Sequence, residues 1–250
     1  MRHLETVMGI PMSVDVRDDD PGTPELVDRA FEVLREADRR FSRYDPASEV
    51  SRFGRGELRP AELSDDLRAV LAVAGQAWED SGGAFSVRRP DGTLDTDGVV
   101  KGWAAQRAAD VLVDGGVRSF CLNAGGDVVT RGEPEPGRGW HVGIRDPSDP
   151  QVFLVVLELR DGAVATSGTY ERGAHVWDGR TGELATELVS ASVVAPDLAR
   201  ADVLATTVLA LGPAGVAWAG EHGATAVIAV GADGRMLTDA PGAALLGTRG

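Results

Sequence analysis

The sequence predicts an α+β fold, with antiparallel or mixed sheets packed against helices. The 250-residue chain is 43% apolar, which is enough for a substantial core. Some segments alternate with the period of a strand and others repeat with the spacing of a helix. These segments come in clusters and not as a regular strand-helix alternation, which favours α+β over a doubly wound parallel sheet. No repeat, low-complexity tract or clear linker is visible.

The elements are expected in the following order along the chain. Met12, Val14 and Val16 alternate within residues 6–16, which is typical of a half-buried strand. Helical spacing follows over residues 25–44, with Pro24 near the start. Further helices are expected over 65–78, 101–112, 197–211 and 213–222, and short strands over 120–129, 152–160, 163–168, 187–195 and 224–231.

The charge and the cysteine content exclude several classes of protein. Twenty-five basic against thirty-nine acidic residues give a net charge of −14, which repels nucleic acid and anionic lipid. Cys121 is the single cysteine, so no internal disulfide forms. No segment reaches the roughly 18 consecutive apolar residues of a membrane span, and the first residues do not have the pattern of a signal peptide. We therefore expect a cytoplasmic protein without a membrane anchor.

The stretch DTDGVVKG carries two carboxylates, a glycine and a lysine where a helix is expected to begin. Asp95, Asp97 and Lys101 surround Gly98 there. Free backbone N–H groups at such a junction favour an anion such as phosphate. The alternative is that Asp95 or Asp97 only caps the helix.

In RADVLATTVLALG, Asp202 and Thr206 stand four residues apart and project from one face of the expected helix. A carboxylate and a hydroxyl are hard oxygen ligands of the kind that Mg²⁺ prefers. The alternative is that Thr206 bonds back to a helix carbonyl while Asp202 is merely solvated.

Two further stretches are candidates for chemistry. His175 lies in a polar segment beside Tyr170, Glu171 and Asp178, where a histidine can act as a general base or be an ordinary surface residue. The pair Gly125-Gly126 allows a close approach of backbone to a ligand, or simply makes a bulge or tight turn. The defining motifs of Rossmann, P-loop, zincin, α/β-hydrolase and zinc-ribbon proteins are absent.

Eight segments in sequence order resemble the ApbE-like FAD:protein FMN transferase family. They are VMGIPMSVDV, FSRYDPASEVSRF, GGAFSV, DTDGVVKGWAAQRAADVL, LNAGGDVVTRG, GIRDP, TSGTYERGAHVWDGRTG and RADVLATTVLALG. The resemblance extends over nearly the whole chain and implies one domain over residues 1–250, a short form without a signal peptide. It implies an enzyme that uses Mg²⁺ to move FMN from FAD to a threonine, or sometimes a serine, of a target protein and releases AMP.

The resemblance also assigns roles to individual residues. It implies a metal site at the Gly98 carbonyl, Asp202 and Thr206, and a catalytic role for His175. The residues implied to contact FAD are Met8, Tyr44, Ala84, Phe85, Ser86, Asp95, Lys101 and Val176. The target protein is expected to carry a D-G-x-[ST]-[GS]-A-T-like acceptor.

Three features depart from the pattern of the family. The segment between GGAFSV and DTDGVVKG is short, Ser86 stands where an aspartate is usual, and Asp97 stands where a small residue is usual. Two alternatives to the transferase therefore stay open. One is a metal-dependent FAD pyrophosphatase that uses water as the acceptor, and the other is an FAD-binding protein without catalysis.

Overall fold

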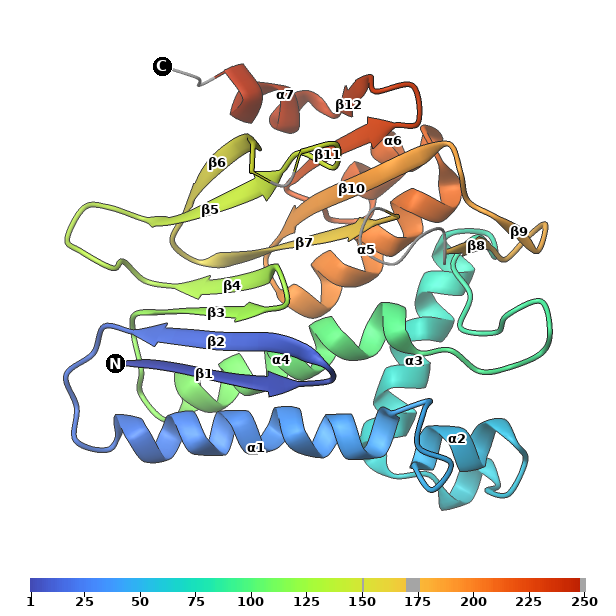
Figure 1. Ribbon diagram of the computed structural model, residues 1–250, viewed down its shortest axis with the longest axis horizontal. Coiled ribbons are helices and arrows are strands. Elements are labelled where there is room, and N and C mark those ends of the chain that lie inside the picture. Colours follow the sequence, from blue (N-terminus) through green and yellow to red (C-terminus); the bar gives the residue numbers. More distant parts are fainter. Residues whose placement is uncertain (150, 170–175, 248–250) are drawn as a thin grey trace.

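An eight-stranded antiparallel sheet organises the molecule. The computed structural model describes residues 1–149, 151–169 and 176–247. The order of strands in the sheet is β1-β2-β3-β4-β7-β10-β11-β12, and Figure 1 shows them stacked from α1 at the bottom to α7 at the top. The strands are β1 (Arg2–Val7), β2 (Ile10–Val16), β3 (Phe120–Ala124), β4 (Asp127–Arg131), β7 (Gly162–Gly168), β10 (Leu188–Ala195), β11 (Ala226–Gly231) and β12 (Met236–Thr238). The predicted α+β class is confirmed.

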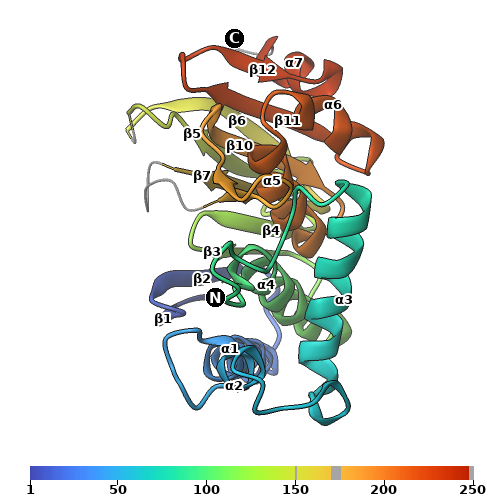
Figure 2. The same ribbon diagram turned by 90° about the vertical axis from the view of Figure 1, so that its right-hand side faces the viewer.

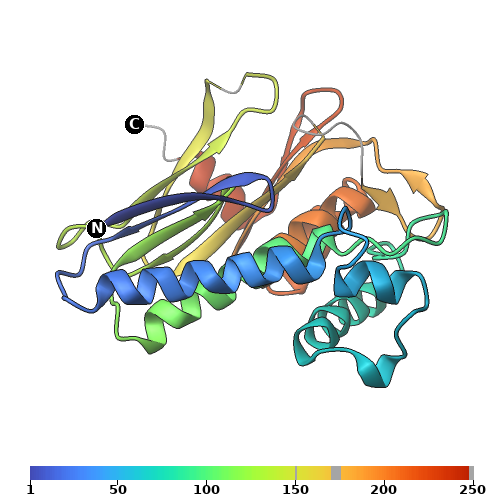
Figure 3. The same cartoon turned by 60° about the horizontal axis from the view of Figure 1, so that its bottom comes forward.

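Helices pack against one face of this sheet. Figures 2 and 3 show α1, α4 and α5 on the same side of the strands, with α3 running beside them. The helices are α1 (Thr23–Phe41), α2 (Glu49–Gly54), α3 (Asp65–Asp80), α4 (Asp97–Asp114), α5 (Leu198–Leu211), α6 (Ala214–Glu221) and α7 (Ala240–Gly247), with a 3₁₀ turn η1 at Pro60–Glu62. No helix in the described part of the chain combines the length and the apolar character needed to cross a bilayer.

A two-stranded ribbon of β5 (Trp140–Arg145) and β6 (Phe153–Leu159) covers part of the other face. Alternation along the sheet strands explains how both faces are filled. On β4, Val128 packs toward this ribbon, whereas its neighbour Val129 packs toward the helices. A second short ribbon joins β8 (Trp177–Asp178) to β9 (Glu183–Leu184).

The two central helices α4 and α5 each bury many residues, because they lie between the sheet and other helices. Both helices bury several alanines, and α4 also buries a glycine, Gly102. At Gly102 a β-carbon would lie 2.5 Å from Asp202 Cβ and 2.7 Å from the Leu198 carbonyl oxygen. Close packing of α4 on α5 therefore requires a glycine at position 102.

The structure differs from the sequence-based expectation at two hairpins. Residues 6–16 were predicted as one strand, but Met8 (φ 54°) and Gly9 (φ 72°) form a two-residue turn between β1 and β2. Residues 120–129 were also predicted as one strand. There Gly125 (φ 65°) and Gly126 (φ 105°) make the turn between β3 and β4, which confirms the tight-turn alternative for this pair.

Helix boundaries also differ. The first helix ends at Phe41 and not at Tyr44, and α4 begins at Asp97, four residues before the predicted start. Neither expected aspartate is the cap residue of α4, because Thr96 occupies that position without a side-chain cap bond. Instead the Asp95 carboxylate accepts a hydrogen bond from the Asp97 backbone N–H (3.1 Å), just before the first turn.

Candidate active site

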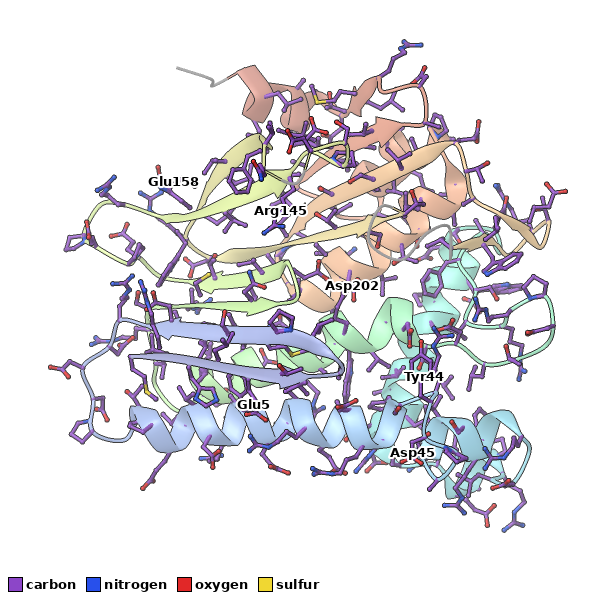
Figure 4. The ribbon with its side chains drawn as sticks, in the orientation of Figure 1. Glu5, Tyr44, Asp45, Arg145, Glu158 and Asp202 are labelled. Atoms are coloured by element: carbon purple, nitrogen blue, oxygen red, sulfur yellow. The ribbon has the colours of Figure 1, made fainter. Side chains whose placement is uncertain are left out.

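A cavity of about 840 Å³ opens between the C-terminal end of α1, the β1–β2 turn, the start of α4 and one face of α5. Its volume lies in the upper part of the range of about 300–1,000 Å³ typical of small-molecule sites. Ten of the twelve predicted site residues line it: Met8, Tyr44, Phe85, Ser86, Asp95, Gly98, Lys101, Val176, Asp202 and Thr206. Figure 4 shows two of them, Tyr44 near α2 and Asp202 nearer the middle of the molecule.

A lysine and two carboxylates meet where α4, α5 and β4 converge. Lys101 Nζ lies 2.5 Å from Asp127 Oδ2 and 3.6 Å from Asp202 Oδ1. Both carboxylates belong to buried side chains, each 2% exposed. Asp127 is fixed by the Thr166 backbone N–H, which donates to its Oδ1 at 3.0 Å. The three groups together carry a net charge of −1, which suits a cavity that accepts a further cation.

The Asp202 carboxylate also reaches the backbone of α4. Its Oδ2 accepts a hydrogen bond from the Gly102 N–H at 2.8 Å. In a regular helix this N–H would bond to the Gly98 carbonyl, four residues earlier. Because this N–H donates to Asp202 and a carbonyl oxygen has two lone pairs, the Gly98 carbonyl can accept another positive partner.

Thr206 lies one turn after Asp202 on the cavity side of α5. Its hydroxyl is 3.0 Å from the Ser167 hydroxyl on β7. A β-carbon placed on Gly98 would lie 3.2 Å from Thr206 Cγ2 and 3.5 Å from Thr206 Oγ1, so these two residues face each other closely. The hydrogen bond to a helix carbonyl that was considered for Thr206 is made by the neighbouring Thr207, whose hydroxyl donates to the Val203 carbonyl at 2.7 Å.

Burial, with a smaller contribution from the negative charge of Asp127, raises the pKa of Asp202 to about 7. The Lys101 ammonium and the Gly102 N–H act in the opposite direction without cancelling the effect of burial. A carboxylate held in this environment gains from binding a cation, because the cation replaces the water that burial removed. The solvated-aspartate alternative for Asp202 is therefore wrong.

An arginine–carboxylate cluster lines another part of the cavity. Arg43 Nη1 lies 3.4 Å from Asp95 Oδ2, and Arg43 Nε lies 3.1 Å from Asp97 Oδ2. Arg89 Nη1 approaches the same Asp95 oxygen at 3.5 Å. Burial lowers the pKa of Arg43, but Asp97 and Asp95 outweigh that effect and raise it overall.

The residues predicted to contact FAD differ in their surroundings. Met8 is half-buried in the β1–β2 turn, where its N–H donates to the Asp38 carboxylate at 3.0 Å. Tyr44 is 80% exposed at the cavity, and its hydroxyl accepts a hydrogen bond from Arg43 Nη2 at 2.8 Å. Val176 and Phe85 are buried in the wall. Ala84 is fully buried and is absent from the cavity lining, so its side chain supports the wall from behind.

His175, the predicted catalytic residue, lies outside the described residues. The strand before it, β7, brings Thr166, Ser167 and Gly168 to the cavity, and Val176 after it also lines the cavity. Both described ends of this segment therefore reach the site.

Two important residues were missed from the sequence. Asp127 follows the Gly125-Gly126 turn directly, and its signal is a carboxylate at the first position of the strand DVVTR, just before two valines. Arg43 lies inside the quoted FSRYDP motif, but nothing in that motif shows that Asp95 and Asp97 are its partners. Those contacts join positions more than fifty residues apart.

The donor set suits a hard divalent cation. No three histidine, cysteine, aspartate or glutamate side chains among the described residues gather closely enough to hold a metal. A cation at this site would therefore need hydroxyl and carbonyl oxygens beside a carboxylate, as Thr206, Gly98 and Asp202 offer. Oxygen ligands with few carboxylates are the surroundings in which Mg²⁺ binds together with substrate phosphates.

Comparison with known proteins places the chain in a family. The ApbE family model matches residues 8–89 and 86–229. A curated FAD:protein FMN transferase of Rhodobacter capsulatus is 31% identical over 256 residues, covering 95% of this chain and 47% of the relative. One from Klebsiella pneumoniae is 29% identical over 182 residues, covering 66% of this chain and 52% of the relative. The chain spans about half the length of these curated relatives.

Solved structures share the fold over their whole length. The ApbE protein of Thermotoga maritima superposes with a TM-score of 0.85 at 19% identity, covering 98% of each chain. The apo form of the Pseudomonas stutzeri flavinyl transferase ApbE gives 0.83 at 25% identity, covering 99% of this chain and 97% of that one. With the sequence match extending over most of its residues, the chain belongs to the ApbE family.

Proposed function

We propose that this protein is a Mg²⁺-dependent transferase that moves FMN from FAD to a threonine or serine hydroxyl of a target protein. The observation that carries the proposal is the set of residues that line the 840 Å³ cavity. It joins the Lys101–Asp127–Asp202 group to the Arg43–Asp95–Asp97 cluster beside an apolar wall. A flavin ring, a diphosphate and a cation each find matching chemistry there.

The reaction exchanges one phosphoester partner for another. The acceptor oxygen forms a bond to the FMN phosphorus of FAD, and the bond between that phosphorus and the bridging oxygen breaks. AMP leaves with the bonding electrons, and the acceptor proton passes to a base. The protein's task is to position the two reactants and stabilise the negative charge on the diphosphate.

The Gly98 carbonyl, Asp202 and Thr206 would hold the cation. When bound, Mg²⁺ would supply charge neutralisation at the diphosphate. Lys101 contributes a fixed positive charge, and Asp127 holds that lysine in place through the 2.5 Å ion pair. Ser167 orients the Thr206 hydroxyl through their 3.0 Å hydrogen bond.

Several parts of this proposal remain predictions from the sequence. They are the cytoplasmic location, His175 as the base that takes the acceptor proton, and the D-G-x-[ST]-[GS]-A-T-like acceptor. The curated relatives are named as FAD:protein FMN transferases, which supports FAD as the donor and a protein as the acceptor.

One incubation tests the function. Purified protein is mixed with FAD, Mg²⁺ and a small domain carrying the acceptor motif, and the intact mass of the domain is measured. A matched domain with alanine in place of the acceptor hydroxyl residue is the control. We expect only the first domain to gain one FMN, with one AMP released for each transfer. Release of FMN and AMP without modification would replace the transferase by a hydrolase, and unchanged FAD would contradict both.

A further inference from the structure

The two-residue turn between β1 and β2 is strained where it reaches the cavity. Met8 has a φ of 54°, and it is the only residue other than glycine with a positive φ in the described part of the chain. Such turns favour asparagine, aspartate or glycine at this position, because a β-carbon is disfavoured in the left-handed region. Met8 also lines the cavity. A side chain that is kept against the preference of the backbone, beside a binding cavity, indicates a function for that side chain.

Asp38 on α1 holds this turn from one side. The turn lies over the C-terminal half of α1 (Figure 1), and the Met8 N–H donates to Asp38 Oδ2 at 3.0 Å. The pairing between β1 and β2 leaves the Met8 N–H without a partner, because the last pair before the turn joins Val7 to Ile10. The Asp38 carboxylate therefore satisfies a donor that the hairpin cannot satisfy, and a carboxylate is a stronger acceptor than a neutral group.

The neighbouring hairpin holds the same turn from the other side. The Gly125 N–H donates to the Pro11 carbonyl at 3.1 Å. A β-carbon on Gly125 would lie 2.5 Å from Ile10 Cδ1, so the turn between β3 and β4 packs closely on the start of β2. The backbone at Met8 is thus held between two residues that line the cavity, Asp38 and Gly125.

The position of Asp38 is not explained by attraction for a ligand. A carboxylate in the lining opposes the entry of an anionic ligand such as a diphosphate. Among the residues that the structure describes, the Met8 N–H is the one hydrogen-bond partner of the Asp38 carboxylate, and no ion pair neutralises it. The contact with Met8 is therefore the contribution of Asp38 that the structure shows.

We propose that Asp38 is a positioning residue for the binding of FAD. Its carboxylate keeps the Met8 backbone in the left-handed conformation. The Met8 side chain thereby stays in the cavity wall, where its thioether packs against the aromatic ring system of the flavin. Asp38 acts through Met8 and does not touch the ligand. This inference rests on the proposed function, because it assumes that FAD occupies the cavity.

The FAD affinity of variants of the full chain tests the inference. Dissociation constants are measured by flavin fluorescence with Mg²⁺ present, at fixed pH and ionic strength. We expect Asp38→Ala, which removes the acceptor, to weaken FAD binding at least fivefold. Asp38→Asn removes the same charge but keeps an acceptor oxygen, so it should stay within twofold of the unaltered protein. Equal affinities of the two variants would show that the acceptor has no role and would overturn the proposal.

Asp28→Ala is the matched control for these variants. It makes the same substitution in the same helix, at a side chain that is 78% exposed and pairs with Arg35 outside the cavity lining. We expect its FAD affinity to stay within twofold of the unaltered protein. A loss as large as that of Asp38→Ala would assign the effect to α1 in general and would contradict a role through Met8.

A double-mutant cycle separates positioning from direct contact with the ligand. Met8→Ala removes the side chain beyond the β-carbon and keeps the same backbone requirement. In that background Asp38→Ala should change FAD affinity less than twofold, because the side chain that Asp38 positions is already gone. If Asp38→Ala weakens binding by the same factor in both backgrounds, Asp38 acts on the ligand directly and the proposal is overturned.

Hydrogen exchange measured by NMR tests the contact without any variant. In the unaltered protein the Met8 amide should have a protection factor at least tenfold above that of Gly9, whose N–H has no partner in the described structure. A Met8 amide no better protected than that of Gly9 would overturn the proposal. Thermal unfolding shows whether Asp38→Ala keeps the fold, and if it does not, this exchange measurement decides.

The same data separate failure of this inference from failure of the proposed function. If the unaltered protein binds no FAD, the proposed function falls and this inference falls with it. If the unaltered protein binds FAD and a folded Asp38→Ala binds it equally well, only the role of Asp38 is overturned.

Discussion

The carboxylate of Asp202 on α5 accepts the backbone N–H of Gly102 on α4 at 2.8 Å. This bond joins two helices that meet closely only because residue 102 has no side chain. It also engages the N–H that would otherwise belong to the Gly98 carbonyl. This one contact between α4 and α5 therefore fixes the Asp202 carboxylate and leaves the Gly98 carbonyl able to accept another positive partner.

Gly102→Ala should disturb both the fold and the site. The new β-carbon would lie 2.5 Å from Asp202 Cβ and 2.7 Å from a backbone oxygen, so α4 and α5 must separate. We expect the free energy of unfolding to fall by roughly 1–3 kcal/mol. Gly75→Ala in α3 is the control, since a β-carbon there meets nothing within 4 Å. It should raise stability by roughly 0.5–1 kcal/mol, and chemical denaturation of both variants provides the comparison.

Asp202→Asn should remove metal-dependent activity while the protein stays folded. In the metal-free protein the pKa of Asp202 is about 7, against 3.8 as the ordinary value. Between these two values the folded state binds a proton that the unfolded state does not. The stability contributed by this group is therefore present in full below pH 3.8 and is lost as pH rises to about 7.

Asparagine does not ionise, so the variant does not lose this stability as the pH rises. Its Lys101 stays paired with Asp127. With a chelator at pH 8 it should be more stable than the unaltered protein by roughly 1–3 kcal/mol, or about 2–8 °C in Tm. The difference should shrink at pH 5, and added Mg²⁺ should raise the Tm of the unaltered protein alone. The measured quantity is the stability of metal-free Asp202→Asn minus that of the metal-free unaltered protein. A smaller difference at pH 8 than at pH 5 would contradict this account of Asp202.

Thr206→Val should weaken the metal site without emptying the core. The change keeps the shape of the side chain and removes the hydroxyl that lies 3.0 Å from Ser167. We expect the Mg²⁺ concentration needed for half-maximal activity to rise about tenfold, which corresponds to about 1.4 kcal/mol, because one oxygen ligand is lost. Thr207→Val is the matched control, because its hydroxyl bonds to the Val203 carbonyl and not into the cavity. The same Mg²⁺ dependence in both variants would remove Thr206 from the ligand set.

Met8→Asn should make the protein more stable and weaken its binding of FAD. Met8 has a φ of 54°, a conformation that costs a non-glycine residue about 1 kcal/mol or more and that asparagine tolerates better. The variant should unfold at a higher temperature, because strain in the β1–β2 turn is relieved. FAD affinity should fall severalfold, since the methionine side chain lining the cavity is lost. A less stable variant, or one with unchanged FAD affinity, would show that the strain has no connection with the site.

The sequence predicted the helices better than the turns between strands. The spacing of apolar residues located α3 and α5 to within two residues at each end, because each has a clear cap, Ser64 and Asp197. The strand β1 was missed because Met8 is an unusual residue for a left-handed turn, so VMGIP did not resemble a hairpin. The Gly125-Gly126 turn carried the stronger signal and was left as one of two alternatives.

The candidate site could be predicted only where its residues are close in sequence. Asp202 and Thr206 share a helix face, so their spacing alone places them together. Lys101 and Asp127 lie on different elements, and only the packing of α4 against the sheet brings them within 2.5 Å. The same holds for Arg43 and Asp97, whose contact depends on where the loop after α1 meets the start of α4.

The most direct test of the metal site is an anomalous-scattering map from a crystal grown with Mn²⁺ and FAD. The account predicts a peak about 2.0–2.3 Å from three oxygens, namely the Gly98 carbonyl, the Asp202 carboxylate and the Thr206 hydroxyl. A peak bound by other residues would contradict it. So would the absence of a peak at these oxygens when the protein shows full Mn²⁺-dependent activity.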